Sequence, residues 1–116
     1  MPYGKEAIVQ EVLASAARTT SGASSAFGVG DGSKVDLFVR VTAVSGTTPT
    51  LDVEATSSDV ATANFVSVKS MTQITAEGDY ITTVSDGLSK YLKVKYTIGG
   101  TTPSFTFSVS MVKHWE

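Results

Sequence analysis

The sequence predicts an all-β protein: a single two-sheet β-sandwich, jelly-roll-like or immunoglobulin-like, of about seven or eight strands. The 116 residues include 16 Thr, 15 Ser and 15 Val, and Thr and Val are β-branched residues that favour strands. Apolar and polar residues alternate in several runs, with turn signals about every 10–12 residues. A repeated segment, Gly-Thr-Thr-Pro, occurs at 46–49 and again 54 positions later at 100–103.

The composition is that of a weakly charged globular domain. Hydrophobic residues make up 41% of the chain and charged residues only 17%, and the formal net charge is −2. This balance gives no electrostatic case for nucleic-acid binding. The absence of cysteine excludes disulfides, and no apolar run approaches the roughly 18 residues that a membrane-spanning helix needs. We therefore expect one domain with no membrane or nucleic-acid partner.

The first element is ambiguous in the sequence. Residues 6–17 contain good helix formers, and their apolar positions also fit one face of a helix. The rest of the chain is strongly β in character. We therefore predict a strand over about 11–19, preceded by an extended arm of residues 1–10, with residues 11–116 forming the sandwich domain.

The middle of the chain reads as short strands joined by turns. Residues 19–34 predict a loop, a short strand around 25–29 and a turn at Gly30-Asp31-Gly32. Alternation over 35–43 predicts a half-buried strand, which the first Gly-Thr-Thr-Pro turns into a return strand over 51–55. Residues 57–59 end that strand.

The second half repeats this pattern. Residues 64–74 predict one or two short strands, Gly78-Asp79 a turn, 80–84 a strand and Asp86-Gly87 another turn. Alternating runs at 92–98 and 105–111 then flank the second Gly-Thr-Thr-Pro. The repeat thus predicts two similar β-hairpins. Their predicted structural turn residues are Gly46, Pro49, Gly99, Gly100 and Pro103.

The two repeats differ in phase before their glycines. After the prolines they match, because Leu51 aligns with Phe105, but the preceding apolar sets are one residue out of step. Since a one-residue slip moves a strand's apolar set to the other face, one copy should carry a β-bulge, around Ala43-Val44. The alternative is that the two hairpins are not equivalent in the fold.

No residues of the sequence form a catalytic set. The one histidine, His114, lies two residues from the end, where a surface position is expected rather than a role in a catalytic triad. A calcium site built from Asp31, Asp36 or Asp59 is the alternative left open. The glycines at 28–32 lack the helix of a phosphate loop. We expect no enzyme activity, no catalytic residues, no cofactor and no metal.

Aromatic residues offer two interpretations. A sugar-binding platform could be lined by Tyr80, Tyr91, Tyr96 and Trp115, whereas core packing or a subunit interface is the simpler alternative. The residues considered for an interface are Tyr3, Ile8, Val9, Tyr91 and Trp115.

Three segments resemble a known class of proteins. They are L-A-S-A-A-R-T-T-S-G at 13–22, V-T-A-V-S-G-T-T-P-T-L-D-V at 41–53 and K-Y-L-K-V-K-Y-T-I-G-G-T-T-P-S-F-T-F-S-V at 90–109. Together they resemble small β-rich structural proteins encoded in the virion gene blocks of tailed bacteriophages. Members of that class often have S-x-D-G after the central strand, whereas this chain has Val60 in place of the glycine.

The resemblance implies a virion structural protein, made in the host cytoplasm and most simply a head decoration (cement) protein. Such proteins bind the outside of the capsid lattice, commonly as homotrimers, so the implied partners are the major capsid protein and a second and third copy of the chain. Two other functions stay open: a carbohydrate- or receptor-binding module of a tail or fibre, and a subunit of a tail tube or connector.

Overall fold

The computed structural model describes residues 8–29, 34–85 and 88–114, and within them the protein is all-β with no helix. Seven strands form one antiparallel sheet. The sequence limits of the strands are β1 Ile8–Arg18, β2 Gly22–Ala23, β3 Phe27–Gly28, β4 Lys34–Ser58, β5 Val66–Ser70, β6 Gly78–Val84 and β7 Tyr91–His114.

Two very long strands carry the fold. β4 has 25 residues and β7 has 24, and they pair antiparallel along their whole length, from Lys34 opposite His114 to Ser58 opposite Tyr91. The predicted pair of hairpins is therefore wrong. The residues before and after each Gly-Thr-Thr-Pro do not pair with each other, because each segment lies inside one long strand. The two repeats face each other across the ladder, with Thr47 opposite Thr101.

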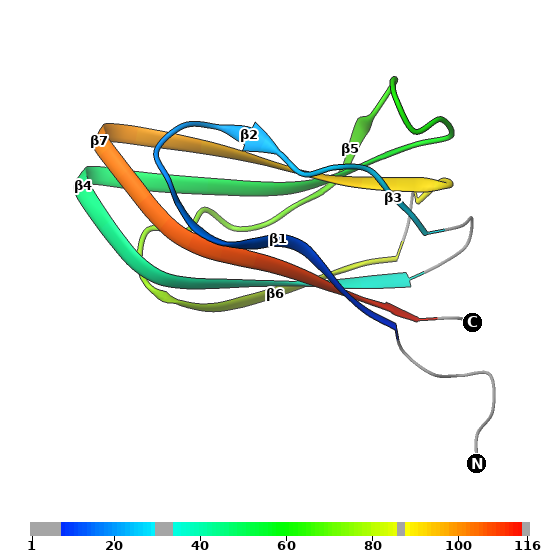
Figure 1. Cartoon of the computed structure of the whole chain (residues 1–116), viewed down its shortest axis with the longest axis horizontal. Helices are drawn as coiled ribbons and strands as arrows, with labels where there is room; N and C mark the ends of the chain where they lie inside the picture. Colours follow the sequence, from blue (N-terminus) through cyan, green and yellow to red (C-terminus); the bar gives the residue numbers. More distant parts are fainter. Residues whose placement is uncertain (1–7, 30–33, 86–87, 115–116) are drawn as a thin grey trace, which may run out of the picture.

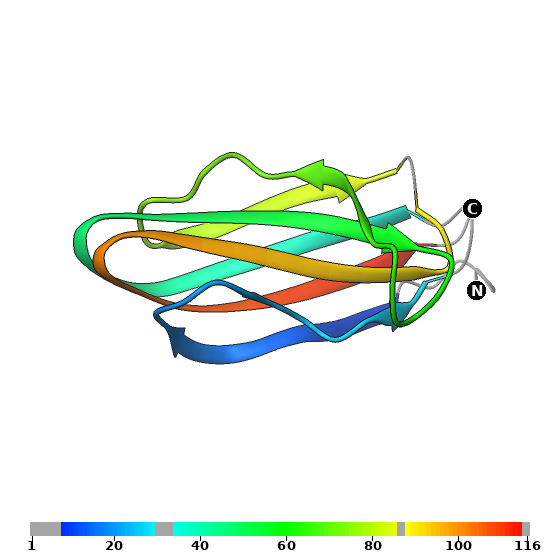
Figure 2. The same ribbon diagram turned by 90° about the horizontal axis from the view of Figure 1, so that it is seen from above.

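The two repeats bend the ladder back on itself. Figure 1 shows β4 and β7 reversing direction together at one end, so that the sheet has two halves lying one above the other. One half contains residues 34–45 of β4 and 104–114 of β7, flanked by β1 and β6. The other contains residues 50–58 and 91–99, flanked by β2, β3 and β5. We call these the first half and the second half of the sheet. Figure 2 shows both bends at the same end of the molecule.

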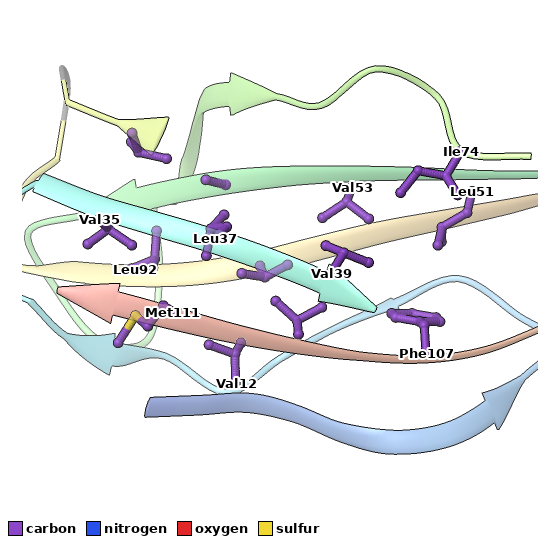
Figure 3. Close-up of a cluster of buried hydrophobic side chains, with 14 of the residues drawn as sticks. Val12, Val35, Leu37, Val39, Leu51, Val53, Ile74, Leu92, Phe107 and Met111 are labelled. Atoms are coloured by element: carbon purple, nitrogen blue, oxygen red, sulfur yellow. The ribbon is translucent and has the colours of Figure 1, made fainter. Parts of the chain in front are cut away.

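The core fills the space between the two halves. Every second residue of β4 from Val35 to Val41 is buried, and so is every second residue of β7 from Phe105 to Met111. The second half contributes residues such as Leu51 and Leu92, both fully buried (Figure 3). Because side chains alternate between the two faces of a strand, these stretches of β4 and β7 bury one face and leave the other more exposed.

The predicted β-bulge is present and lies next to the predicted position. The register of β4 against β7 shifts between Val41 and Ala43, so that Thr42 is the extra residue. Val41 is buried, Thr42 and Ala43 are both exposed, and Val44 is again partly buried against the core. The extra residue shifts the alternation by one position, so that Val44 rather than Ala43 points inward before the bend. This shift explains why the apolar positions of the two repeats are one residue out of step before their glycines.

Strand boundaries differ from the sequence prediction at several places. The ambiguous first element is a strand, but it starts at Ile8, so residues 8–10 of the predicted arm pair with β7. Gly78 and Asp79 belong to β6 rather than to a turn. The 64–74 region gives β5 and a single bridge between Ile74 and Leu51. The predicted turns at 30–32 and 86–87 lie outside the described residues.

Candidate interaction surface

The five predicted turn residues lie together where the sheet bends. Gly46 and Gly100 have positive φ values of 107° and 116°. A Cβ at Gly46 would lie 2.6 Å from the carbonyl oxygen of Thr102, and one at Gly100 would lie 2.7 Å from that of Thr48. Each glycine thus packs against the backbone of the other repeat, next to Pro103 and Pro49 respectively. A Cβ at Gly99 would lie 2.9 Å from the Thr50 hydroxyl. The repeat therefore forms a reciprocal structural corner.

The residues considered for an interface are not brought together by the described part of the chain. Tyr3 and Trp115 lie outside the described residues. Ile8 and Val9 pair through their backbone with Lys113 and Val112 at one edge of the first half. Tyr91 is half-buried at the start of β7, in the second half, opposite Gly28 and Ser58.

The described tyrosines do not form one aromatic platform. Tyr91 and Tyr96 are five residues apart in a stretch of β7 with unbroken register, so their side chains point to opposite faces. The Tyr96 ring packs edge-on against Phe107, with the ring centroids 5.3 Å apart. Tyr80 lies on β6 in the other half, and its hydroxyl donates to the carbonyl oxygen of Ala76. Tyr96 therefore serves core packing.

The described residues include no group of three His, Cys, Asp or Glu side chains placed to hold a metal ion. Of the three aspartates considered for calcium, Asp31 lies outside the described residues. Asp36 is on β4 and accepts a hydrogen bond of 2.7 Å from the Thr83 hydroxyl, while Asp59 follows the end of β4. His114 pairs by register with Lys34 at the end of β7.

The outer face of the first half exposes two large apolar side chains next to each other. Phe38 and Ile81 lie directly opposite each other on β4 and β6, and their side chains are 42% and 59% exposed. Ser110 of β7 continues this row on the other side of Phe38. Parallel rows lie on either side, and they contain Ser108, Arg40 and Asp79 on one side and Val112, Asp36 and Thr83 on the other. We call these nine residues the outer-face patch.

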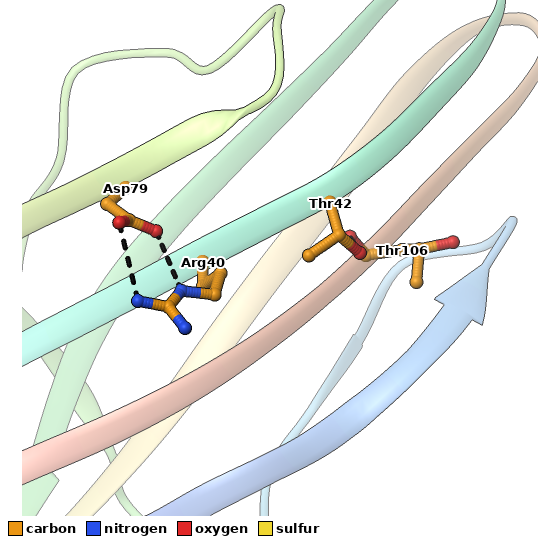
Figure 4. Close-up of polar contacts among 4 residues, drawn as sticks. All are labelled: Arg40, Thr42, Asp79 and Thr106. Carbon is orange, nitrogen blue, oxygen red and sulfur yellow. Dashed lines mark hydrogen bonds and ion pairs between the residues drawn. The ribbon is translucent and has the colours of Figure 1, made fainter.

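A charged pair borders the apolar row of the patch. Arg40 donates from Nε to the Asp79 carboxylate at 2.9 Å, with a longer contact of 3.5 Å from Nη2 (Figure 4). The pKa of the Arg40 guanidinium is raised, first by this hydrogen bond and then by the charge of Asp79. The pair is well exposed, so it contributes little to stability. A shallow open hollow runs over this face and is bordered by Phe38, Arg40, Ile81, Ser108 and Ser110, among others. An open, mostly apolar hollow suits a protein surface rather than an enclosed small ligand.

Sequence reasoning missed this patch, although one signal for it was present. Phe38 occupies an outward position in the alternation of 35–43, and the outward positions before and after it, Asp36 and Arg40, are charged. A large aromatic residue at an outward position of a strand is informative in a way that a scattered exposed valine is not. Its partner Ile81 could not be assigned to the same face without the pairing of β4 with β6.

Sequence reasoning also missed the role of Arg18. Its guanidinium donates to the carbonyl oxygens of Phe107 and Ala14, both at 2.7 Å, and of Ala16 at 3.2 Å. The same group lies 4.7 Å from the ring centroid of Phe107 and 5.7 Å from that of Tyr96. Arg18 thus fastens the end of β1 to both halves of the sheet.

Comparison with models of known protein families and with curated proteins finds no match for this sequence. Among the described residues there is no helix long and apolar enough to span a bilayer.

Proposed function

We propose that this protein is a virion structural protein of a tailed bacteriophage, and that it acts as a capsid decoration protein on the outside of the head lattice. The proposal rests first on the resemblance of residues 13–22, 41–53 and 90–109 to such proteins. Its partners would be the major capsid protein and further copies of itself, in a homotrimer. Location in the virion belongs to the same proposal.

We propose that the bent sheet is a jelly-roll-like sandwich, because a long antiparallel strand pair folds over and places its two halves face to face around a core. The support is the continuous β4–β7 ladder and the crossing of both strands between halves at the Gly-Thr-Thr-Pro corner.

The observation that carries the functional proposal is the outer-face patch. Phe38 and Ile81 lie side by side on the solvent face of two paired strands, where contact with another protein would bury their apolar surface. Around them lie three hydroxyl side chains, Ser108, Ser110 and Thr83, together with Val112, Asp36 and the ion pair of Arg40 with Asp79. Contact with another protein need not bury an unpaired charge here, because Arg40 and Asp79 pair with each other and Asp36 accepts from the Thr83 hydroxyl.

The test is binding to capsid shells. Shells assembled from the major capsid protein of the same phage would be mixed with the purified protein and sedimented. We expect saturable co-sedimentation of the wild-type protein and at least tenfold weaker binding of Phe38→Ser. The control is Val66→Ser, which removes a 63% exposed valine from β5 in the other half and should bind as the wild type does. Absence of binding by the wild-type protein would overturn the proposal.

The same experiment examines the proposed arm. Because β1 starts at Ile8, the informative deletion is residues 1–7, which leaves all of β1 in place. Deletion of 1–10 would also remove three residues that pair with β7 and would confuse loss of contact with loss of folding. We expect the shorter deletion to fold as the full chain does and to bind shells more weakly.

A further inference from the structure

We propose that β6 is a self-pairing edge, through which two copies of the protein join antiparallel into one continuous sheet. Such pairing needs only the purified protein and does not depend on the proposed function. A strand at an edge presents unpaired backbone N–H and C=O groups, which another strand can pair with unless the edge is disrupted.

The described edge strands differ sharply in how well they are protected. β1 carries two register shifts, between Glu11 and Leu13 and between Leu13 and Ala16, and Arg18 donates to backbone carbonyls at its end. β5 has a register shift opposite Ala55 and Thr56. β2 and β3 have two residues each. All of these features discourage pairing with another chain.

β6 lacks these protections. Its seven residues, Gly78–Val84, pair with Val41–Val35 of β4 in unbroken register. Four of the seven, at 81–84, are β-branched, and the described residues pair β6 with β4 alone. The only charged side chain of β6, Asp79, is already engaged by Arg40. A regular, β-branched strand without a lysine or a proline is a favourable template for a further strand.

The side chains of β6 are complementary to those of β6 in a second copy of the chain. If a two-fold axis passes beside Ile81, the two Ile81 side chains stand opposite each other, and Asp79 stands opposite Thr83 of the second copy. On the outer face this gives an unbroken apolar row: Phe38 and Ile81 of one copy, then Ile81 and Phe38 of the other. Apolar pairs directly across two strands stabilise the pairing.

The charges are compatible with the same register. The neighbouring row would contain Arg40 and Asp79 of one copy and Thr83 and Asp36 of the other, so no two like charges are direct cross-strand neighbours. An isologous contact of this kind closes after two copies. The outer faces of both copies then lie on the same side of the continuous sheet, so the outer-face patch stays open and doubles in width.

The pairing should be weak in dilute solution. Seven paired residues and one apolar row bury less than the roughly 1,200 Å² typical of stable interfaces. We therefore expect a dissociation constant in the range of about 10 μM to 1 mM. Site-specific cross-linking captures such a complex, and the chain has no cysteine of its own to interfere.

The experiment is oxidation of single-cysteine variants at about 1 mM protein, followed by non-reducing electrophoresis. Ile81→Cys should give a covalent dimer, because the Cβ atoms of directly opposed residues are only about 4.5–5.5 Å apart. Val66→Cys is the matched control, since Val66 has a similar exposure, 63% against 59%, on the bulged edge strand β5. If Ile81→Cys forms no more dimer than Val66→Cys, the proposal is overturned.

The register has its own test. Thr83→Cys alone should cross-link poorly, because two copies of residue 83 would be about 13 Å apart along the strands. Mixing it with Asp79→Cys should give the mixed dimer, because these positions are opposed. Efficient cross-linking of Thr83→Cys with itself would contradict the two-fold register.

A lysine variant tests the contact without cross-linking. Ile81→Lys places a charge in the centre of the proposed contact while leaving the core intact, since Ile81 is 59% exposed. We expect light scattering at rising concentration to show loss of two-fold association in Ile81→Lys and its retention in Val66→Lys. An unchanged mass in Ile81→Lys, with wild-type circular dichroism, would overturn the proposal. Ile81→Thr, which keeps β-branching, is the substitute if the lysine variant fails to fold.

Discussion

At the scale of single residues, the repeated Gly-Thr-Thr-Pro allows the backbone of both long strands to bend sharply. Gly46 and Gly100 combine positive φ with an approach to the opposite backbone that leaves no room for a Cβ. Thr48 and Thr102 also have positive φ, 46° and 45°, which is uncommon for a β-branched residue. The surrounding corner holds them there, and each threonine hydroxyl donates to the carbonyl of the residue before it.

Alanine at either corner glycine should destabilise the protein strongly. Gly46→Ala and Gly100→Ala must strain φ and displace the backbone of the opposite repeat, so we expect each to lower the free energy of unfolding by about 2–4 kcal/mol. Urea denaturation measures this. Gly28→Ala is the control, because its Cβ would meet only the Tyr91 ring at 3.9 Å and its φ is not in the left-handed range. Equal effects of all three substitutions would contradict the reciprocal corner.

Two of the buried hydroxyl groups, at Ser57 and Ser58, tie neighbouring loop segments to the end of β4. Ser57 donates to the carbonyl of Tyr91 and accepts from the N–H of Ser89, both at 2.8 Å. Ser58 donates to Ala63 and accepts from Val60, closing the turn after β4. Among the described residues, no buried side-chain polar atom lacks a hydrogen-bond partner. The turn after β4 that contains Val60 is thus closed by the Ser58 hydroxyl.

At the scale of elements, β1 shows how a sequence that suits a helix becomes a strand. The isolated segment fits a helical face, but the edge of β7 offers it a ladder of backbone hydrogen bonds and a place in the core for Val12. Tertiary pairing outweighs the modest intrinsic preference of a short segment. Two bulges adapt the strand to β7, and Arg18 fastens its end.

Arg18→Lys should weaken this attachment. Lysine keeps the charge but cannot reproduce the planar fork that reaches the carbonyls of Ala14 and Phe107, so we expect a loss of about 1–2 kcal/mol in urea denaturation. Arg40→Lys is the matched control, because Arg40 makes an exposed pair with Asp79. A change in Arg40→Lys as large as that in Arg18→Lys would show that general charge effects, rather than the fork, are responsible.

At the scale of the whole molecule, the ladder of β4 and β7 connects all the described strands. Each of the other strands pairs with β4 or β7, and both of these strands run through both halves of the sheet. The halves also share a single core. Since the two halves share both long strands and neither has its own apolar interior, we expect the protein to unfold as one unit.

Matched core truncations test this cooperativity. Val39→Ala lies in the first half and Val53→Ala in the second, and both valines are 1% exposed. Each should lower stability by about 2 kcal/mol and accelerate amide hydrogen exchange to a similar extent in both halves. Exchange that accelerates only in the half carrying the substitution would show that the two halves open separately.

The all-β class, the inward-facing residues of the long strands and a bulge next to Ala43 could be predicted from the sequence, because these features depend on local alternation and its phase. The sequence also marked Gly46 and Gly100 as special. By contrast, the folded chain was needed to show that the two repeats meet inside one ladder, that the first strand starts at Ile8, and that Phe38 stands beside Ile81 of the edge strand β6. These features depend on pairings between residues about 40 to 100 positions apart, which local patterns do not encode.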